Sequence, residues 1–186
     1  MKQLQKLVYL FIIGAILLRV LRHYGLINLP PNFAPIAAIA LFSGSYFANK
    51  KSALIVPLVA MLISDAFIGF YNPFVMISVY LCFILSAVIG FYIKKNKNLT
   101  NIIGGALLSS VIFYLVTNYA VWAFSSIYAH TFSGLIQSYI MAIPFFKWTL
   151  LGDLSYVAVM FGGYEFVKFL LENKNINKLK LQNSNL

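Results

Sequence analysis

Long, continuous runs of apolar residues separated by short polar gaps dominate the pattern of this chain. A helix needs about 20 such residues to cross the hydrocarbon core of a membrane, with a range of about 17–25. β-Barrel strands would instead alternate polar and apolar residues over about ten positions, which these runs do not do. The pattern predicts an all-α membrane protein with six spanning helices: Leu4–Leu21, Phe33–Ala48, Ser52–Phe70, Pro73–Ile93, Asn101–Phe124 and Trp148–Leu171.

Three stretches need a separate interpretation. The segment Phe33–Ala48 is short for a span, so we expect it to tilt or to have its ends buried in protein. The segment Ser133–Phe146 is apolar but contains a glutamine and a proline, and it is expected to be a helix or re-entrant piece packed on one face. The polar residues 172–186 are expected to form a flexible cytoplasmic tail behind a membrane domain of residues 1–171.

The composition supports this class. Hydrophobic residues make up 61% of the 186 positions and charged residues only 10%, whereas about a quarter of a soluble domain is charged. The net charge is +10, but the lysines gather in gaps between apolar runs and near the chain ends, as in membrane proteins, which argues against nucleic-acid binding. A single cysteine, Cys82, excludes an internal disulfide and any multi-cysteine zinc or iron–sulfur site.

The basic residues predict the orientation of the helices. Lysines occur before the first predicted span, between the second and third, between the fourth and fifth, and after the sixth. The joins at 71–72 and 125–133 carry neither lysine nor arginine. By the positive-inside rule, both termini are expected in the cytoplasm. Arg19 and Arg22 fall at the outer end of the first span, where they either face the outer headgroups or reach into a ligand site.

The few polar residues inside the predicted spans lie in the outer half of the membrane. With a rise of about 1.5 Å per residue, Asp65, Asn118 and Asp153 lie about 8–9 Å below the outer ends of their spans, and Cys82 about 14 Å. Ionisable groups in a membrane usually face the bundle interior or a water-filled cavity. A pocket open to the outside is therefore predicted. Its expected lining also includes residues of the outer loops and aromatic residues at a similar depth: Asn32, Tyr71, Asn72, Tyr80 and Trp122.

Each candidate also has a simpler interpretation. Asp65 caps a helix or bonds Ser64, and Asp153 starts a helix after a break at the preceding glycine. A lone cysteine in a membrane helix usually packs as a small hydrophobe. Trp122 has the character of an interfacial anchor. A pocket is predicted because these residues share one depth, and that depth follows from the predicted topology.

Small residues recur at every fourth position in two segments. Ala40, Gly44 and Ala48 form one row, and Gly105 and Ser109 repeat the spacing. Such rows let helix backbones approach closely. Packing inside the bundle is favoured over a surface for a partner protein.

Catalytic motifs of membrane enzymes do not match this sequence. Intramembrane aspartyl proteases carry Tyr-Asp and Gly-x-Gly-Asp, but here Ser precedes Asp65 and Leu-Leu-Gly precedes Asp153. Both histidines lie in predicted outer loops, so a rhomboid-like serine–histidine pair is not expected. The chain contains no zinc-protease, phosphate-loop or nucleophile-elbow motif. A non-enzymatic role is therefore predicted.

Several stretches, in their order and spacing, resemble a known family. They are PNFAPIAAIALFSG (31–44), VPLVAMLISDAFIGF (56–70), VYLCF (79–83), TNYAVW (117–122), YAHTFSGL (128–135), AIPFFKWTLLGDLSY (142–156) and FGGYE (161–165). Over roughly residues 30–165 the chain is similar to the S components of energy-coupling-factor (ECF) vitamin transporters, and most of all to the solitary BtuM-type cobalamin transporters. The resemblance implies an S-component-like bundle of six helices in the bacterial cytoplasmic membrane, with an outward-facing pocket.

The resemblance also implies a substrate. In BtuM-type proteins a cysteine in this V-Y-x-C-F-like context binds the cobalt of a corrinoid, and here that residue is Cys82. A soft thiolate suits a late first-row metal, and the charge of a bound metal deprotonates a thiol. Cobalamin would be the transported cargo, with no intrinsic cofactor. Hydrogen bonds to its amide side chains and contacts with its ring faces would come from Asp65, Tyr71, Asn72, Asn118, Trp122 and Asp153.

Three alternatives remain at this point. An S component for another vitamin would work with a separate ATPase module, although the few small residues in the first span, Gly14 and Ala15, weakly favour a solitary protein. An ion- or proton-coupled permease would use Asp65 and Asp153. A membrane enzyme with a hydrophobic substrate is the third.

Overall fold

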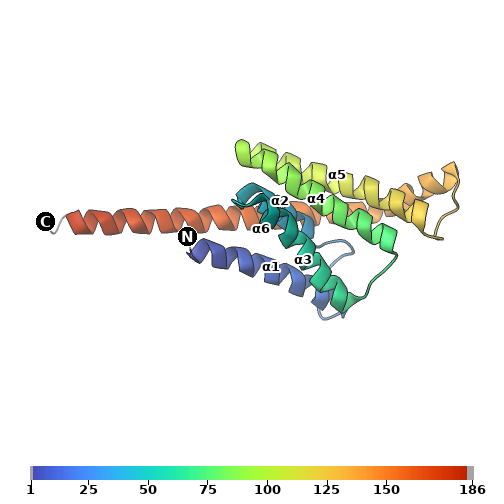
Figure 1. Cartoon of the computed structure of the whole chain (residues 1–186), viewed down its shortest axis with the longest axis horizontal. Helices are drawn as coiled ribbons and strands as arrows, with labels where there is room; N and C mark the ends of the chain where they lie inside the picture. Colours follow the sequence, from blue (N-terminus) through green and yellow to red (C-terminus); the bar gives the residue numbers. More distant parts are fainter. Residues whose placement is uncertain (1, 184–186) are drawn as a thin grey trace.

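The computed structural model describes residues 2–183, and every regular element within that range is a helix. The helices are α1 (Lys2–His23), α2 (Ile36–Tyr46), α3 (Lys50–Ile68), α4 (Pro73–Lys95), α5 (Leu99–Phe124) and α6 (Phe132–Asn183) (Figure 1). Four of them, α3 to α6, are long and apolar enough to cross a membrane. The prediction of an all-helical chain with helices long and apolar enough to span a membrane is therefore confirmed.

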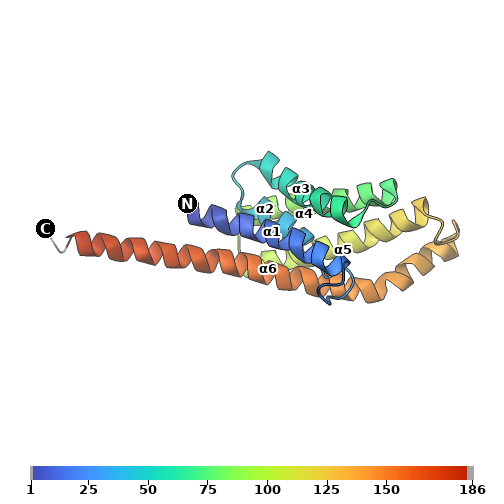
Figure 2. The ribbon, with the colours of Figure 1, turned by 90° about the horizontal axis from the view of Figure 1, so that it is seen from below.

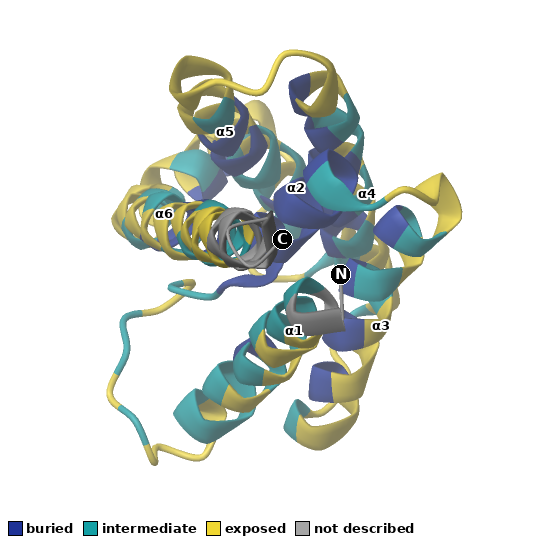
Figure 3. Ribbon diagram, turned by 90° about the vertical axis from the view of Figure 1, so that its left-hand side faces the viewer, coloured by how far each residue is buried: buried dark blue, intermediate teal, exposed yellow. Residues whose placement is uncertain are grey.

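Five helices form a ring around the remaining one. Neighbouring helices contact each other in the order α1, α3, α4, α5 and α6, and α6 closes the ring by contacting α1. Helix α2 lies in the middle and contacts all five others (Figure 3). All residues of α2 from Ile36 to Ser45 are buried. Helix α2 is thus the core of the bundle, with no face left for lipid.

Helix α2 is only about half as long as a membrane crossing. Its 11 residues rise about 16 Å, whereas the hydrocarbon core is about 30 Å thick. Pro35 immediately precedes the helix, and the residue before a proline disfavours helical geometry, so the helix begins no earlier. At the other end Phe47 is extended, with φ −72° and ψ 139°. The predicted span Phe33–Ala48 is therefore a shorter helix whose ends lie in protein.

Helices α2 and α4 pack backbone against backbone. A Cβ atom added to Gly44 would lie 2.1 Å from the carbonyl oxygen of Ala87, and one added to Gly90 would lie 2.4 Å from that of Leu41. Only glycine permits this approach. Ala40 and Gly44 are buried here while Ala48 is exposed, so the small-residue row serves interior packing over most of its length.

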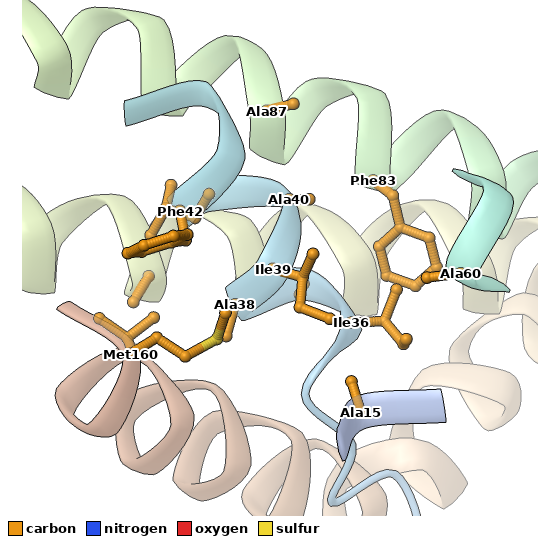
Figure 4. Close-up of a cluster of buried hydrophobic side chains, with 14 of the residues drawn as sticks. Ala15, Ile36, Ala38, Ile39, Ala40, Phe42, Ala60, Phe83, Ala87 and Met160 are labelled. Atoms are coloured by element: carbon orange, nitrogen blue, oxygen red, sulfur yellow. The ribbon is translucent and has the colours of Figure 1, made fainter. Parts of the chain in front are cut away.

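The hydrophobic core is built on α2. Ile36, Ile39 and Phe42 are each almost completely buried. They belong to one cluster with Phe83 of α4 and Met160 of α6, to which α1 contributes Ala15 and α3 contributes Ala60 (Figure 4). The outward faces of the ring, by contrast, expose large apolar side chains such as those of α4: Phe74, Ile77, Leu81 and Leu85. An apolar exterior of this extent is suited to lipid.

Helix α6 unites two segments that were predicted separately. Ser133–Phe146 and Trp148–Leu171 are parts of one helix that contains Pro144. Figure 2 shows that α6 bends along its course, and a proline inside a helix removes a hydrogen bond and produces such bends. The helix also continues through Asn183, where we expected a flexible tail from residue 172; residues 184–186 of that tail lie outside the described range.

Candidate ligand cavity

A cavity of about 390 Å³ lies inside the ring, at the N-terminal end of α2. All six helices contribute residues to its lining. Because α2 is short, it fills one half of the ring interior and leaves the other half open. The volume lies within the range of about 300–1,000 Å³ that is typical of small-molecule sites.

The cavity adjoins the N-terminal end of α2. Ile36 and Ala37 line it, and the N-cap residue Pro35 offers no side-chain acceptor. The first hydrogen bond of the helix joins the Ile39 amide to the Pro35 carbonyl. Within residues 2–183, the amide groups of Ile36, Ala37 and Ala38 have no acceptor. A helix start with unpaired N–H groups is electropositive and binds anionic groups.

Two arginines of α1 line the same cavity. The Nε atom of Arg22 donates to the carbonyl oxygen of Leu29 at 3.1 Å, which ties the loop before α2 to α1. The Nη1 atom of Arg19 lies 2.7 Å from Oδ1 of Asp65 and also donates to the Ser64 hydroxyl. Both arginine side chains are thus part of the cavity wall.

Asp65 lies behind the cavity wall and holds Arg19 in place. Its side chain is completely buried. Oδ1 meets Arg19 as an ion pair, and Oδ2 accepts a hydrogen bond from the Tyr80 hydroxyl at 2.9 Å. The carboxylate therefore joins α1, α3 and α4. Asp65 and Tyr80 act as positioning residues for Arg19, because neither lines the cavity.

Tyr71 lies in the turn between α3 and α4 and lines the cavity. Burial and the negative charge of Asp65 raise the pKa of Tyr71 to about 12, although the charge of Arg19 opposes this. A raised pKa keeps the hydroxyl protonated throughout the physiological range. Tyr71 can therefore both donate and accept a hydrogen bond beside the arginines.

The other polar groups of the cavity come from α5 and α6. Asp153 lines it and is almost completely buried, and its Oδ2 atom accepts a hydrogen bond from the Ser110 hydroxyl at 2.6 Å. The Asn118 amide also lines the cavity, and its Nδ2 atom donates to the Tyr114 carbonyl at 2.7 Å. This donation leaves the amide oxygen of Asn118 as an acceptor. The cavity therefore offers acceptors on α5 and α6 and cationic donors on α1.

Aromatic rings supply much of the remaining surface. They come from α4, α5, α6 and the loop before α2: Phe33, Phe83, Phe113, Tyr114, Phe145 and Phe146. Such rings bury apolar or planar parts of a ligand. The arrangement of a few polar groups on an aromatic surface is typical of sites for small organic molecules.

The structure brings only some of the predicted site residues to the cavity. Asn32, Tyr71, Asn118 and Asp153 line it, and Asn32 has a positive φ of 62° in the loop before α2. Asn is one of the few residues that tolerate this conformation. The structure thus gathers these four of the nine predicted site residues at one cavity.

Two of the predicted site residues, Asn72 and Trp122, stabilise loops at this end of the bundle. Asn72 caps α4 by accepting hydrogen bonds from the Phe74 and Val75 amides, and its Nδ2 atom donates to the Phe124 carbonyl at 2.6 Å. Trp122 donates from Nε1 to the Ala129 carbonyl at 3.0 Å, which ties α5 to the turn before α6. Neither lines the cavity.

Cys82 is buried within the bundle and does not line the cavity. Its neighbours on α4, Val79 and Phe83, do line it. Among residues 2–183, no three His, Cys, Asp or Glu side chains gather in a way that could hold a metal ion. A metal at Cys82 would therefore have to bring its other ligands with it.

Sequence reasoning missed one wall of the cavity. Residues 142, 145, 146, 149 and 153 all line it and lie on one face of α6. Their spacing of three and four residues is a helical signal. The predicted break between residues 146 and 148 concealed it, because it divided this face between two segments. A helix continued through Lys147 would have revealed it.

Comparison with known proteins places the chain in a family. Residues 2–175 match a family described as being of unknown function, DUF6580, and the chain belongs to it. No curated protein and no solved structure matches the chain. The function must therefore be inferred from the cavity.

Proposed function

We propose that this protein is a substrate-binding membrane transporter that captures a small amphipathic solute from outside and carries it across the bacterial cytoplasmic membrane. The observation that carries the proposal is the half-length helix α2, whose unpaired N-terminal amides open onto a cavity lined by Arg19 and Arg22. Transporters often place half-helix N-termini near the bilayer midplane, where these bind anionic groups of the substrate.

The proposed orientation has six crossings with both termini in the cytoplasm. It draws support from the lysines at the ends of α4 and α6 and at the start of α3. In this orientation the arginines lie towards the outside. The opposite end of α2 is blocked by packed rings of Phe42, Tyr46, Phe161 and Tyr164, with centroids 4.3–5.4 Å apart. The cavity is then open outward and closed inward.

Charged contacts reinforce this inner closure. The Tyr46 hydroxyl donates to Oε1 of Glu165 at 2.6 Å. The ammonium group of Lys97 lies 3.6 Å from the centre of the Tyr46 ring and 3.4 Å from Oε1 of Glu165. These contacts join α2, α6 and the turn between α4 and α5. Release to the cytoplasm would require them to separate.

The lining favours a solute with an anionic group, an aromatic or apolar body and a hydrogen-bond donor. The anionic group would pair with Arg22 and the amides of α2, since Arg19 already pairs with Asp65. The body would lie against the phenylalanine rings. The donor would face Asp153 and Asn118. A small carboxylate-bearing vitamin fits this description.

Arg22→Gln is expected to weaken binding of a carboxylate ligand about tenfold or more, because a hydrogen bond to a charged group contributes about 1.5–3 kcal/mol. Suitable probes are pairs that differ only in charge, such as biotin and biotinamide or nicotinate and nicotinamide. Binding is measured by calorimetry and by the rise in unfolding temperature of the purified chain. Lys6→Gln is the matched control, because it removes the same charge from the other end of α1. Equal binding of acid and amide, or equal losses in the two variants, would contradict an anion site.

A corrinoid is the second candidate substrate, as the family resemblance implies. It is favoured by the position of Cys82 on α4, next to the cavity residues Val79 and Phe83. The cavity as it stands suits a smaller ligand than a corrin ring, so corrinoid binding would require the Phe83 side chain and α4 to move. Protein purified after growth with cobalamin should then be coloured, and Cys82→Ala should alter its visible spectrum. Colourless wild-type protein that does not take up added cobalamin would exclude this candidate.

A further inference from the structure

A second cavity, of about 510 Å³, lies between the end of α4 and the turn joining α2 to α3. It is separate from the ligand cavity and shares no residue with it. Three lysines line it: Lys50 begins α3, and Lys94 and Lys95 end α4. The remaining lining is mostly apolar and includes Val88 and Phe91. We call this site the lysine groove.

The lysine groove concentrates positive charge without a counter-ion from the described residues. None of its three lysines forms an ion pair with a carboxylate among residues 2–183. Lys94 and Lys95 suit the C-terminus of α4, because the helix dipole is negative there. Lys50 is unfavourably placed at the positive N-terminus of α3, whose first turn contains no acidic residue. An anion in the groove would compensate for this arrangement.

The groove continues into the lipid-facing surface of α4. Leu81, Leu85 and Tyr92 are exposed on that helix, and Val88 lies between them in the sequence and lines the groove. The lysines mark the level at which the apolar helix ends and the headgroup region begins. A molecule bound here would place an anionic group among the lysines and a hydrocarbon chain along α4.

We propose that the lysine groove binds the headgroup phosphate of an anionic phospholipid, with one acyl chain lying on α4. Basic pockets between helices at the cytoplasmic surface of membrane proteins commonly bind such headgroups. An acidic segment of a partner protein would also be attracted by the lysines. The lipid is favoured because the apolar wall of the groove is continuous with the surface that faces the hydrocarbon core. Bound lipid would link the end of α4 to the α2–α3 turn.

Native mass spectrometry of the full chain in detergent tests this proposal, with phosphatidylglycerol and phosphatidylcholine of identical acyl chains as probes. The wild type should retain one phosphatidylglycerol molecule in preference to phosphatidylcholine. Replacing Lys50, Lys94 and Lys95 together by glutamine should weaken phosphatidylglycerol binding at least tenfold, because each lysine near an anionic headgroup contributes about fivefold. Binding of phosphatidylcholine should not change.

The matched control replaces Lys2, Lys6 and Lys174 by glutamine, which removes the same charge elsewhere, and it should change binding less than about twofold. Equal losses in both triple variants would overturn the proposal in favour of diffuse attraction. Displacement of the lipid by inorganic phosphate would indicate a site for the free anion and would also overturn it. So would equal binding of the two lipids. If the triple variant does not fold, Lys95→Gln alone should still weaken binding several-fold, because it removes one headgroup-binding lysine. It should not disturb the fold, because the Lys95 ammonium lies over Tyr92 of its own helix, 5.9 Å from the ring centre.

Discussion

Asp65→Ala is expected to destabilise the folded protein by about 3–5 kcal/mol, the cost typical of removing one partner from a buried ion pair. The carboxylate is completely buried, and the guanidinium group that it holds is mostly buried. Alanine would leave Arg19 without a counter-charge and the Tyr80 hydroxyl without its acceptor. Three helices meet at this carboxylate, so the loss should be measurable as a lower unfolding temperature of the purified protein in detergent.

Two further variants separate charge pairing from the hydrogen bond. Tyr80→Phe removes only one donor and should cost about 1.5–3 kcal/mol, because the acceptor of that hydrogen bond is a charged carboxylate. The double variant Arg19→Met/Asp65→Leu removes both charges and should be much more stable than Asp65→Ala, because apolar residues of similar size often replace a buried pair at little cost. If the double variant lost as much stability as the two single variants together, the two side chains would not be energetically coupled. The stabilising role assigned to Asp65 would then be wrong.

The coarse fold and the level of the cavity could be predicted from sequence alone. Continuous apolar runs identify helices for lipid, and the constant rise of a helix fixes how deep each residue lies. This is why Asn118 and Asp153, predicted at similar depths on different spans, both line the cavity. Depth follows from counting along one helix and requires no knowledge of how the helices pack.

The direction in which a side chain faces could not be predicted in the same way. Asp65 and Asn118 were predicted at similar depths, yet Asn118 lines the cavity and Asp65 lies behind its wall, paired with Arg19. In this chain most faces of a helix are apolar, so hydropathy does not distinguish the interior from lipid. The pairing of Arg19 with Asp65 likewise depends on α1 packing beside α3, which no local pattern specifies.

The central position of α2 was the largest omission, and it has the greatest consequence for the site. A span of sixteen apolar residues was expected to cross the membrane, but Pro35 and the extended Phe47 limit the helix to Ile36–Tyr46. The resulting half-length helix leaves room for the cavity, and Ile36 and Ala37 of its first turn line it. The row at Ala40 and Gly44 indicated close packing, although it did not reveal that α4 is the helix that packs there.

Gly44→Ala is therefore expected to destabilise the protein by about 1–3 kcal/mol or more, because an added methyl group in a packed core forces the backbone apart. The new Cβ atom would lie 2.1 Å from the Ala87 carbonyl oxygen, and a backbone atom cannot rotate away as a side chain can.

Gly104→Ala is the matched control. Gly104 lies inside a helix with nothing within 4 Å of the added atom, so alanine there should stabilise the protein by about 0.5–1 kcal/mol. Thermal unfolding in detergent measures both changes. A Gly44→Ala variant as stable as Gly104→Ala would mean that α2 and α4 do not pack backbone to backbone, and that α2 is not held as the rigid centre from which the cavity is built.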